Sequence, residues 1–223
     1  MLKYPCLVLD HDDTVVQSMK TLSYPFFLYI LEQFRPGATI SLADYVRGCH
    51  DLGFVGVCRE WFDFTEEELS NEHGQWSAYI RTHTPDPYPG IRRILNRQKE
   101  AGGRICVVSH SGAENITRDY RAHFDVLPDA IYGWDLPEAQ RKPNPYPLEH
   151  IMETYGYSPE KLLMVDDMKL GWKMAAPLGV KVAYAGWSGL GIPEITREME
   201  EICDFSFDSV SDLETFLFGE CKA

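Results

Sequence analysis

The sequence predicts an α/β fold in which a parallel sheet carries helices on both faces and a helical domain is inserted near the N-terminus. From about residue 89 onward, short apolar runs alternate with amphipathic segments, which is typical of βαβ units with right-handed crossovers. Another apolar run, at residues 7–9, precedes a long segment whose apolar residues recur at helical spacing. We therefore expect residues 1–16 and 89–223 to form one core and residues 17–88 to form the inserted helical domain.

Five segments have the short, apolar character of strands that are buried on both faces of a sheet. They are residues 7–9, 104–108, 130–132, 161–165 and 180–185. Helices are expected between them. Capping-box sequences at residues 65–68 and 211–214 predict two helix starts, and the glycine-dotted residues 48–56 predict turns inside the inserted domain.

Composition narrows the class of protein. A chain of 223 residues that is 44% hydrophobic and 25% charged is typical of a globular protein with a sizeable core. The net charge of −13, without any run of Lys or Arg, argues against a nucleic-acid partner. Six scattered cysteines without metal-ligand spacing indicate reduced thiols. Neither a signal peptide nor a membrane-spanning run is indicated, so we expect a cytoplasmic monomer or weak dimer with no membrane partner.

Polar residues follow the predicted strands where each strand ends. They are Asp10 and Asp12 after the first strand, Ser109 after the second, and Asp166 and Asp167 after the fourth. In addition, Lys142 lies in a loop just before a predicted helix. Because the carboxyl ends of parallel strands meet at one edge of a sheet, these side chains are expected to converge. Several carboxylates in one place repel each other and favour a divalent cation. A nucleophilic carboxylate, an acid/base, a hydroxyl and a lysine are what phosphoryl transfer through an aspartyl-phosphate requires.

In this order the residues resemble the four motifs of the haloacid dehalogenase-like (HAD) superfamily. The matching segments are Asp10-His11-Asp12-Asp13-Thr14, Ser109, Lys142-Pro143-Asn144-Pro145, and Asp166-Asp167 with Gly171. The position of the insertion, and Tyr88-Pro89-Gly90 at its end, resemble the branch with a helical cap, which includes phosphoglycolate phosphatases and β-phosphoglucomutases. The resemblance implies a Rossmann-like core with a cap domain, and it covers the core but not the cap.

The resemblance also implies roles for individual residues. Asp10 is the expected nucleophile and Asp12 the general acid and base. Ser109 and Lys142 are expected to bind the transferred phosphoryl group, whereas His110 either contacts the substrate or faces water. The implied cofactor is Mg²⁺, with ligands from Asp10, the Asp12 carbonyl, Asp167 and, as a further candidate, Asp166. The expected activity is hydrolysis of a small phosphorylated metabolite by a Mg²⁺-dependent phosphatase.

Two features qualify this assignment. Asp13 stands where the family usually has Gly, which adds charge near the expected metal. A sugar-phosphate mutase shares all four motifs, but residues 17–23 lack the histidine that such mutases place early in the cap.

A catalytically silent binding protein is disfavoured because the motif residues are intact, and Asp12 argues against dehalogenation. The cap residues that recognise the substrate are not indicated, although Arg47, His50, Arg59 and His73 are candidates for a second anionic group.

Overall fold

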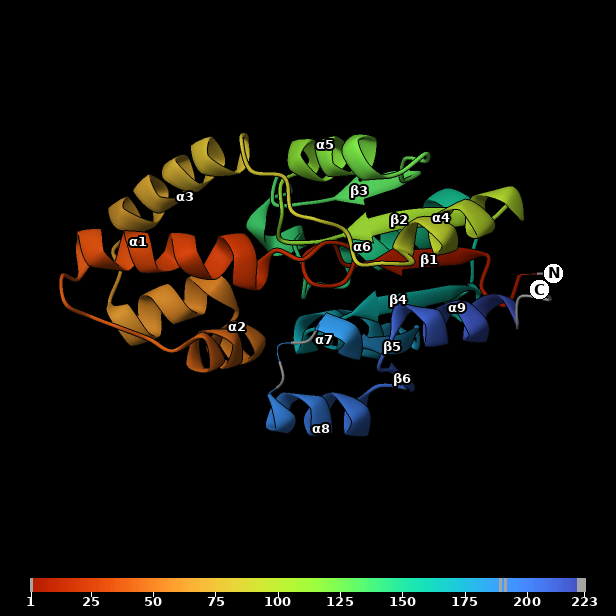
Figure 1. The fold of residues 1–223 in the computed structure, drawn as a ribbon. Coiled ribbons are helices and arrows are strands. Elements are labelled where there is room, and N and C mark those ends of the chain that lie inside the picture. The colour runs from red at the N-terminus through yellow and green to blue at the C-terminus, as the bar shows by residue number, and fades with distance from the viewer. Residues whose placement is uncertain (1, 189, 191, 220–223) are drawn as a thin grey trace.

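The computed structural model describes residues 2–188, 190 and 192–219, and these form a parallel sheet with an inserted helical body beside it (Figure 1). The sheet order is β3-β2-β1-β4-β5-β6. Its strands are β1 (Cys6–Leu9), β2 (Arg104–Val108), β3 (Ala130–Tyr132), β4 (Leu162–Asp166), β5 (Lys181–Ala185) and β6 (Phe205–Phe207). The predicted α/β class is confirmed, and each of the five predicted strands corresponds to one in the sheet.

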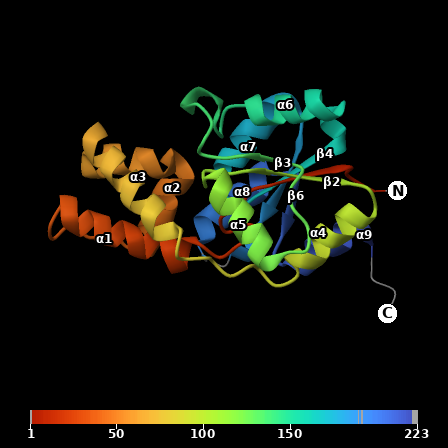
Figure 2. The ribbon, with the colours of Figure 1, turned by 90° about the horizontal axis from the view of Figure 1, so that it is seen from above.

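The core helices cover both faces of the sheet, as Figure 2 shows, with α6 and α7 on one side and α4, α5 and α9 on the other. Their bounds are α4 (Ile91–Glu100), α5 (Ala113–His123), α6 (Tyr146–Tyr155), α7 (Lys169–Ala175), α8 (Pro193–Ile202) and α9 (Val210–Phe218). Leu7 and Leu9 of β1 pack towards α4 and α5, whereas Cys6 and Val8 pack towards α6 and α7. Both faces of β1 are thus buried, which explains its unbroken apolar sequence.

Helices α1 (Tyr24–Phe34), α2 (Leu42–Gly56) and α3 (Glu66–Ile80) form the helical body, called the cap below (Figure 1). The cap has its own apolar core, in which the Phe27 ring stacks on Tyr45 at 4.7 Å. Val15 and Tyr88 are buried in the core cluster and lie on the two segments that join the cap to the sheet. The Tyr88 N–H donates to the Val15 carbonyl (3.0 Å), so the two linkers lie side by side.

Two predictions of local structure were wrong or incomplete. Residues 48–56 are helical apart from Gly53, because tertiary packing overrides the low helix propensity of glycine. A Cβ at Gly48 would lie 2.6 Å from Val57, so this glycine permits close packing. The N-cap of the last helix is Ser209, two residues before the start of the predicted capping box, and the helix begins at Val210. The predicted box at residues 65–68 is confirmed.

Helix α8 and strand β6 were not predicted. The short β6 lies at the edge of the sheet, and its Phe-Ser-Phe sequence is only partly buried, so it lacks the apolar run of a central strand. In the described part of the chain, no helix has the length and apolar character needed to cross a bilayer. The five described cysteines are free thiols, and Cys221 lies outside the described residues.

Helix α2 joins the cap to the core. Val46 lies in a buried apolar cluster with Met199 of α8. Beside this cluster, His50 Nε2 lies 3.1 Å from the Glu198 carboxylate, which also pairs with Lys169 at the start of α7. Buried apolar contacts and partly buried polar pairs together make this a close-packed junction.

Candidate active site

The carboxyl ends of β1 and β4 bring Asp10 and Asp166 to the same edge of the sheet, and Lys142 reaches both from the loop before α6. The Lys142 ammonium nitrogen lies 2.8 Å from Asp10 Oδ1 and 2.9 Å from Asp166 Oδ2. Three of the residues singled out in the sequence therefore make direct contact. Asp167, the next residue after Asp166, is buried in the same place.

These charges are almost fully buried. Burial opposes the charge of Lys142, but its two carboxylate partners raise its pKa, so it remains an ammonium group. Burial raises the pKa of Asp10 from 3.8 to about 7, with Lys142 acting in the opposite direction and Asp166 and Asp12 adding to the rise. The nucleophile predicted from the sequence thus depends on neighbouring positive charge to be ionised.

Gly171 allows Asp166 to hold its position. A Cβ at Gly171 would lie only 2.2 Å from Asp166 Oδ2, the oxygen that accepts from Lys142. The other oxygen, Oδ1, accepts from the Met168 N–H at 2.8 Å. The glycine that follows the acidic pair is therefore needed because the backbone of α7 passes against this carboxylate.

Asp12 lies apart from the lysine. Its Oδ2 accepts from the Ser111 hydroxyl at 2.6 Å and from the Ser109 hydroxyl at 3.4 Å. Ser109 therefore reaches the site as expected. Ser111 was not singled out in the sequence, although its place two residues after Ser109, in the same turn, was a usable signal.

Asp13 connects the first motif to both linkers of the cap. Its backbone is in the left-handed region (φ 54°), which Asp tolerates better than most residues. Its carboxylate accepts from the Met19 N–H (2.8 Å) and from the Tyr88 hydroxyl (3.1 Å). Burial, followed by the charge of Asp12, raises the pKa of Asp13 to about 7. Its charge also acts on Asp167, close to the expected metal ligands.

His110 links the second motif to the third. Burial and the charge of Lys142 lower its pKa to about 4, so the ring is neutral near pH 7. Nε2 lies 2.6 Å from the Lys142 carbonyl, and the proton is assigned to this nitrogen because a carbonyl can only accept. The ring also lies edge-on to Trp134 at 6.1 Å. His110 thus holds the backbone of Lys142, and its contact with substrate stays a prediction.

A divalent cation fits this donor set. Carboxylate oxygens of Asp10, Asp166 and Asp167 all lie within 4.8 Å of one another, and all three residues are buried. Lys142 supplies one positive charge for three carboxylates, and burial raises the pKa of Asp167 well above its usual value. Oxygen ligands with excess negative charge suit a hard ion such as Mg²⁺. The Asp12 carboxylate is outside this group, which leaves its carbonyl as the expected ligand.

The four cap residues considered for a second anion are less available than the sequence suggested. Three of them pair with carboxylates: Arg47 with Glu194, His50 with Glu198 and Arg59 with Glu66. The fourth, His73, lies 5.8 Å from the Trp134 ring of the core. The structure therefore gives these residues partners of their own.

Comparison with known proteins identifies the family. A model described as haloacid dehalogenase-like hydrolase matches residues 7–185, and the chain belongs to this family. A phosphoglycolate phosphatase of Aquifex aeolicus is 26% identical over 216 residues, which is 93% of each chain. Pyrophosphatase PpaX of Halalkalibacterium halodurans is 30% identical over 132 residues, covering 57% of this chain and 58% of the relative.

Solved structures share the fold. A putative haloacid dehalogenase-like hydrolase from Bacteroides fragilis has a TM-score of 0.79 at 20% identity, covering 95% of this chain and all of that one. CbbY from Rhodobacter sphaeroides, solved with xylulose-(1,5)bisphosphate, has a TM-score of 0.73 at 18% identity, covering 96% of both chains. The family inferred from the motifs is confirmed.

The close approach at Gly171 leads to a prediction. In Gly171→Ala, the new methyl group displaces the Asp166 carboxylate and with it Lys142. We expect hydrolysis of p-nitrophenyl phosphate to fall about 100-fold, as for ångström-scale misplacement in other active sites. Gly74→Ala is the matched control, because a Cβ there meets nothing within 4 Å. Equal activity of the two variants would show that Asp166 does not need this space.

The raised pKa values predict how stability depends on pH. Asp10 and Asp13 release their protons near pH 4 when unfolded but near pH 7 when folded, so the metal-free protein loses stability as the pH rises between these values. We expect Mg²⁺ to bind the ionised carboxylates, so its addition should raise the melting temperature more at about pH 7.5 than at about pH 5. Asp167→Asn should weaken this response. An equal Mg²⁺ response at both pH values contradicts the assignment of the site.

Proposed function

We propose that this protein is a Mg²⁺-dependent phosphatase that hydrolyses a small phosphorylated metabolite through an aspartyl-phosphate on Asp10. The observation that carries the proposal is the contrast between two neighbouring carboxylates. Asp10 contacts the Lys142 ammonium, whereas Asp12 contacts hydroxyl groups. One environment suits a nucleophile and the other suits an acid that gains and loses a proton. The similarity to phosphoglycolate phosphatases supports the same activity.

The residues divide the reaction into two steps. In the first, an Asp10 oxygen attacks phosphorus as the bond to the leaving oxygen breaks, and Asp12 gives its proton to that oxygen. In the second, Asp12 takes a proton from water as the water attacks phosphorus, and phosphate is released with Asp10 restored. Lys142 and the Ser109 hydroxyl would hold phosphoryl oxygens, a role that their contacts with Asp10 and Asp12 support. Mg²⁺, held by Asp10, Asp167 and the Asp12 carbonyl, would offset negative charge on the phosphoryl group.

A sugar-phosphate mutase is the alternative, because it would use the same core residues. It requires the phosphorylated aspartate to be protected from water until a second hydroxyl arrives. Residues 17–23 contain no histidine to serve that chemistry, and the Met19 N–H in this segment is bound by Asp13. This favours release of phosphate to water.

One assay tests both activities. The protein is incubated with Mg²⁺ and phosphoglycolate, pyrophosphate, or a hexose 1-phosphate with a bisphosphate primer, while inorganic phosphate and sugar isomers are measured together. We expect phosphate release from at least one compound. Asp10→Asn should lower it by about 1,000-fold or more, because the amide has the same shape but cannot form the acyl phosphate.

The controls separate the parts of the proposal. Circular dichroism and the melting temperature of Asp10→Asn establish that the variant is folded. Exhaustive EDTA treatment should abolish turnover, and Mg²⁺ should restore it. Isomerisation that outpaces phosphate release would identify a mutase, and full turnover without metal would refute the role of Mg²⁺.

A further inference from the structure

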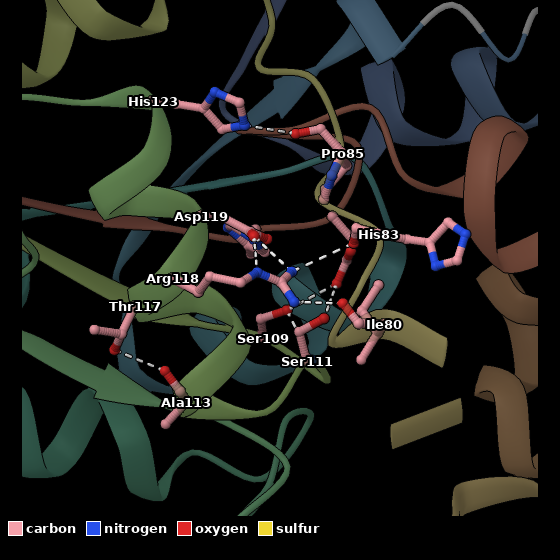
Figure 3. A network of polar contacts seen from close by, with 12 residues as sticks. Ile80, His83, Pro85, Ser109, Ser111, Ala113, Thr117, Arg118, Asp119 and His123 are labelled. Atoms are coloured by element: carbon pink, nitrogen blue, oxygen red, sulfur yellow. Dashed lines mark hydrogen bonds and ion pairs between the residues drawn. The ribbon is translucent and has the colours of Figure 1, made fainter. Parts of the chain in front are cut away.

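The cap meets the core differently on its two sides. On the α2 side, the junction with α7 and α8 is apolar, buried and reinforced by polar pairs. On the α3 side, two polar side chains of α5 reach across, as Figure 3 shows: Arg118, and His123, whose Nε2 lies 2.8 Å from the Pro85 carbonyl. Arg118 donates to the carbonyl of Ile80, the last residue of α3, and to the His83 carbonyl at 3.5 Å.

The same arginine is tied to the interior of the core. Its Nε and one terminal nitrogen donate to Asp119 Oδ1 at 2.8 and 2.6 Å. The other oxygen of Asp119 lies 3.1 Å from His11 Nε2. Asp119 and His11 are 2% and 1% exposed, so this carboxylate depends on its two partners to offset burial.

His11 places the end of this chain of contacts inside the first motif, between Asp10 and Asp12. Its carbonyl accepts from the N–H groups of Val15 and Val16, which form the turn that leads into the cap. Asp119 and Arg118 therefore connect the loop that carries Asp10 with the C-terminal end of α3 in the cap. Because Tyr120 stacks on the His11 ring at 6.0 Å, the ring is also held from the side.

An internal ion pair of the core would account for Arg118 and Asp119, but not for the contacts with the cap. The face of α5 that carries Arg118 borders a hollow of about 410 Å³, lined by Ala113, Glu114, Thr117, Arg118 and Arg121. Beside this hollow, Arg118 reaches two backbone carbonyls that lie outside its own helix. Such charge-assisted bonds form only when α3 lies close to α5.

We propose that Arg118 is a positioning residue that fastens the α3 end of the closed cap and, through Asp119 and His11, fixes the loop that carries Asp10 and Asp12. Opening of the cap then separates α3 from α5 and pivots at the α2 junction. The bonds to Ile80 and His83 break, while the pair with Asp119 persists. The kinetic part of this inference rests on the proposed phosphatase function, but the structural part does not.

Hydrogen exchange of the whole protein tests the structural part. Arg118→Met removes both sets of bonds, so amide exchange should become about 10-fold faster both at residues 78–86 and at residues 9–16. Arg118→Lys keeps a positive charge beside Asp119, but a lysine lacks the planar set of donors that also reaches the carbonyls of Ile80 and His83. It should therefore loosen residues 78–86 and leave residues 9–16 close to wild type. Arg121→Met is the matched control on the same helix face and should change neither segment.

Turnover of p-nitrophenyl phosphate with Mg²⁺ tests the kinetic part. We expect kcat of Arg118→Met to fall about 10-fold, because Asp119 loses the partner through which it holds the loop of Asp10 and Asp12, with KM changed by no more than about twofold. Arg121→Met should match wild type. A melting temperature close to wild type shows that the effect is not a general loss of stability.

The outcomes separate the two proposals. Wild-type exchange at residues 78–86 in Arg118→Met, or faster exchange throughout the core, would overturn the positioning role. If the wild-type protein releases no phosphate from any ester, the proposed function fails. The exchange pattern of the three variants still decides whether Arg118 joins the cap to the first-motif loop.

Discussion

The contact of the Lys142 ammonium with Asp10 and Asp166 is the interaction on which the rest of the site depends. Three carboxylates are buried at one sheet edge, and Lys142 provides the balancing charge within hydrogen-bond distance. Removing one partner from a buried ion pair commonly costs about 3–5 kcal/mol, because the other charge is left uncompensated. Two neighbouring residues help to position this contact. Gly171 leaves room for the Asp166 carboxylate, and the His110 ring binds the Lys142 carbonyl. The remaining negative charge is what makes a divalent cation fit.

Much of the core could be predicted from the sequence because its central strands are buried on both faces. An apolar run such as Leu7–Leu9 or Ile105–Val108 has no other common explanation when it alternates with helices. The prediction failed where burial is partial or where packing overrides local preference. Strand β6 lies at the sheet edge, and α2 remains helical around Gly48 because that glycine lets α2 approach Val57. Such effects depend on how segments pack against one another in space, which periodicity does not reveal.

The candidate site, like the fold, could be predicted from the sequence only in part. Residues that follow strands, such as Asp10 and Ser109, could be found because strand ends meet at one edge. Several supporting contacts could not, because they join residues far apart in the chain, such as Tyr88 with Asp13 and Asp119 with His11. Asp13 was noted only as a departure from the family, yet it binds both cap linkers. The pairing of Arg118 with Asp119, and of Asp119 with His11, has no sequence signature, since one arginine in an amphipathic helix is ordinarily a surface residue.

Trapping the covalent intermediate tests the central claim most directly, namely that Lys142 holds Asp10 as the group that accepts the phosphoryl group. The protein is mixed with Mg²⁺ and its best phosphate ester, quenched during turnover, and treated with borohydride, which reduces an acyl phosphate to an alcohol. Mass spectrometry of the peptide that contains residues 4–20 should then place the reduced residue at Asp10, and Asp10→Asn should give no such product. Reduction at Asp12 or at any other carboxylate, or turnover with no trapped residue at all, would contradict the account.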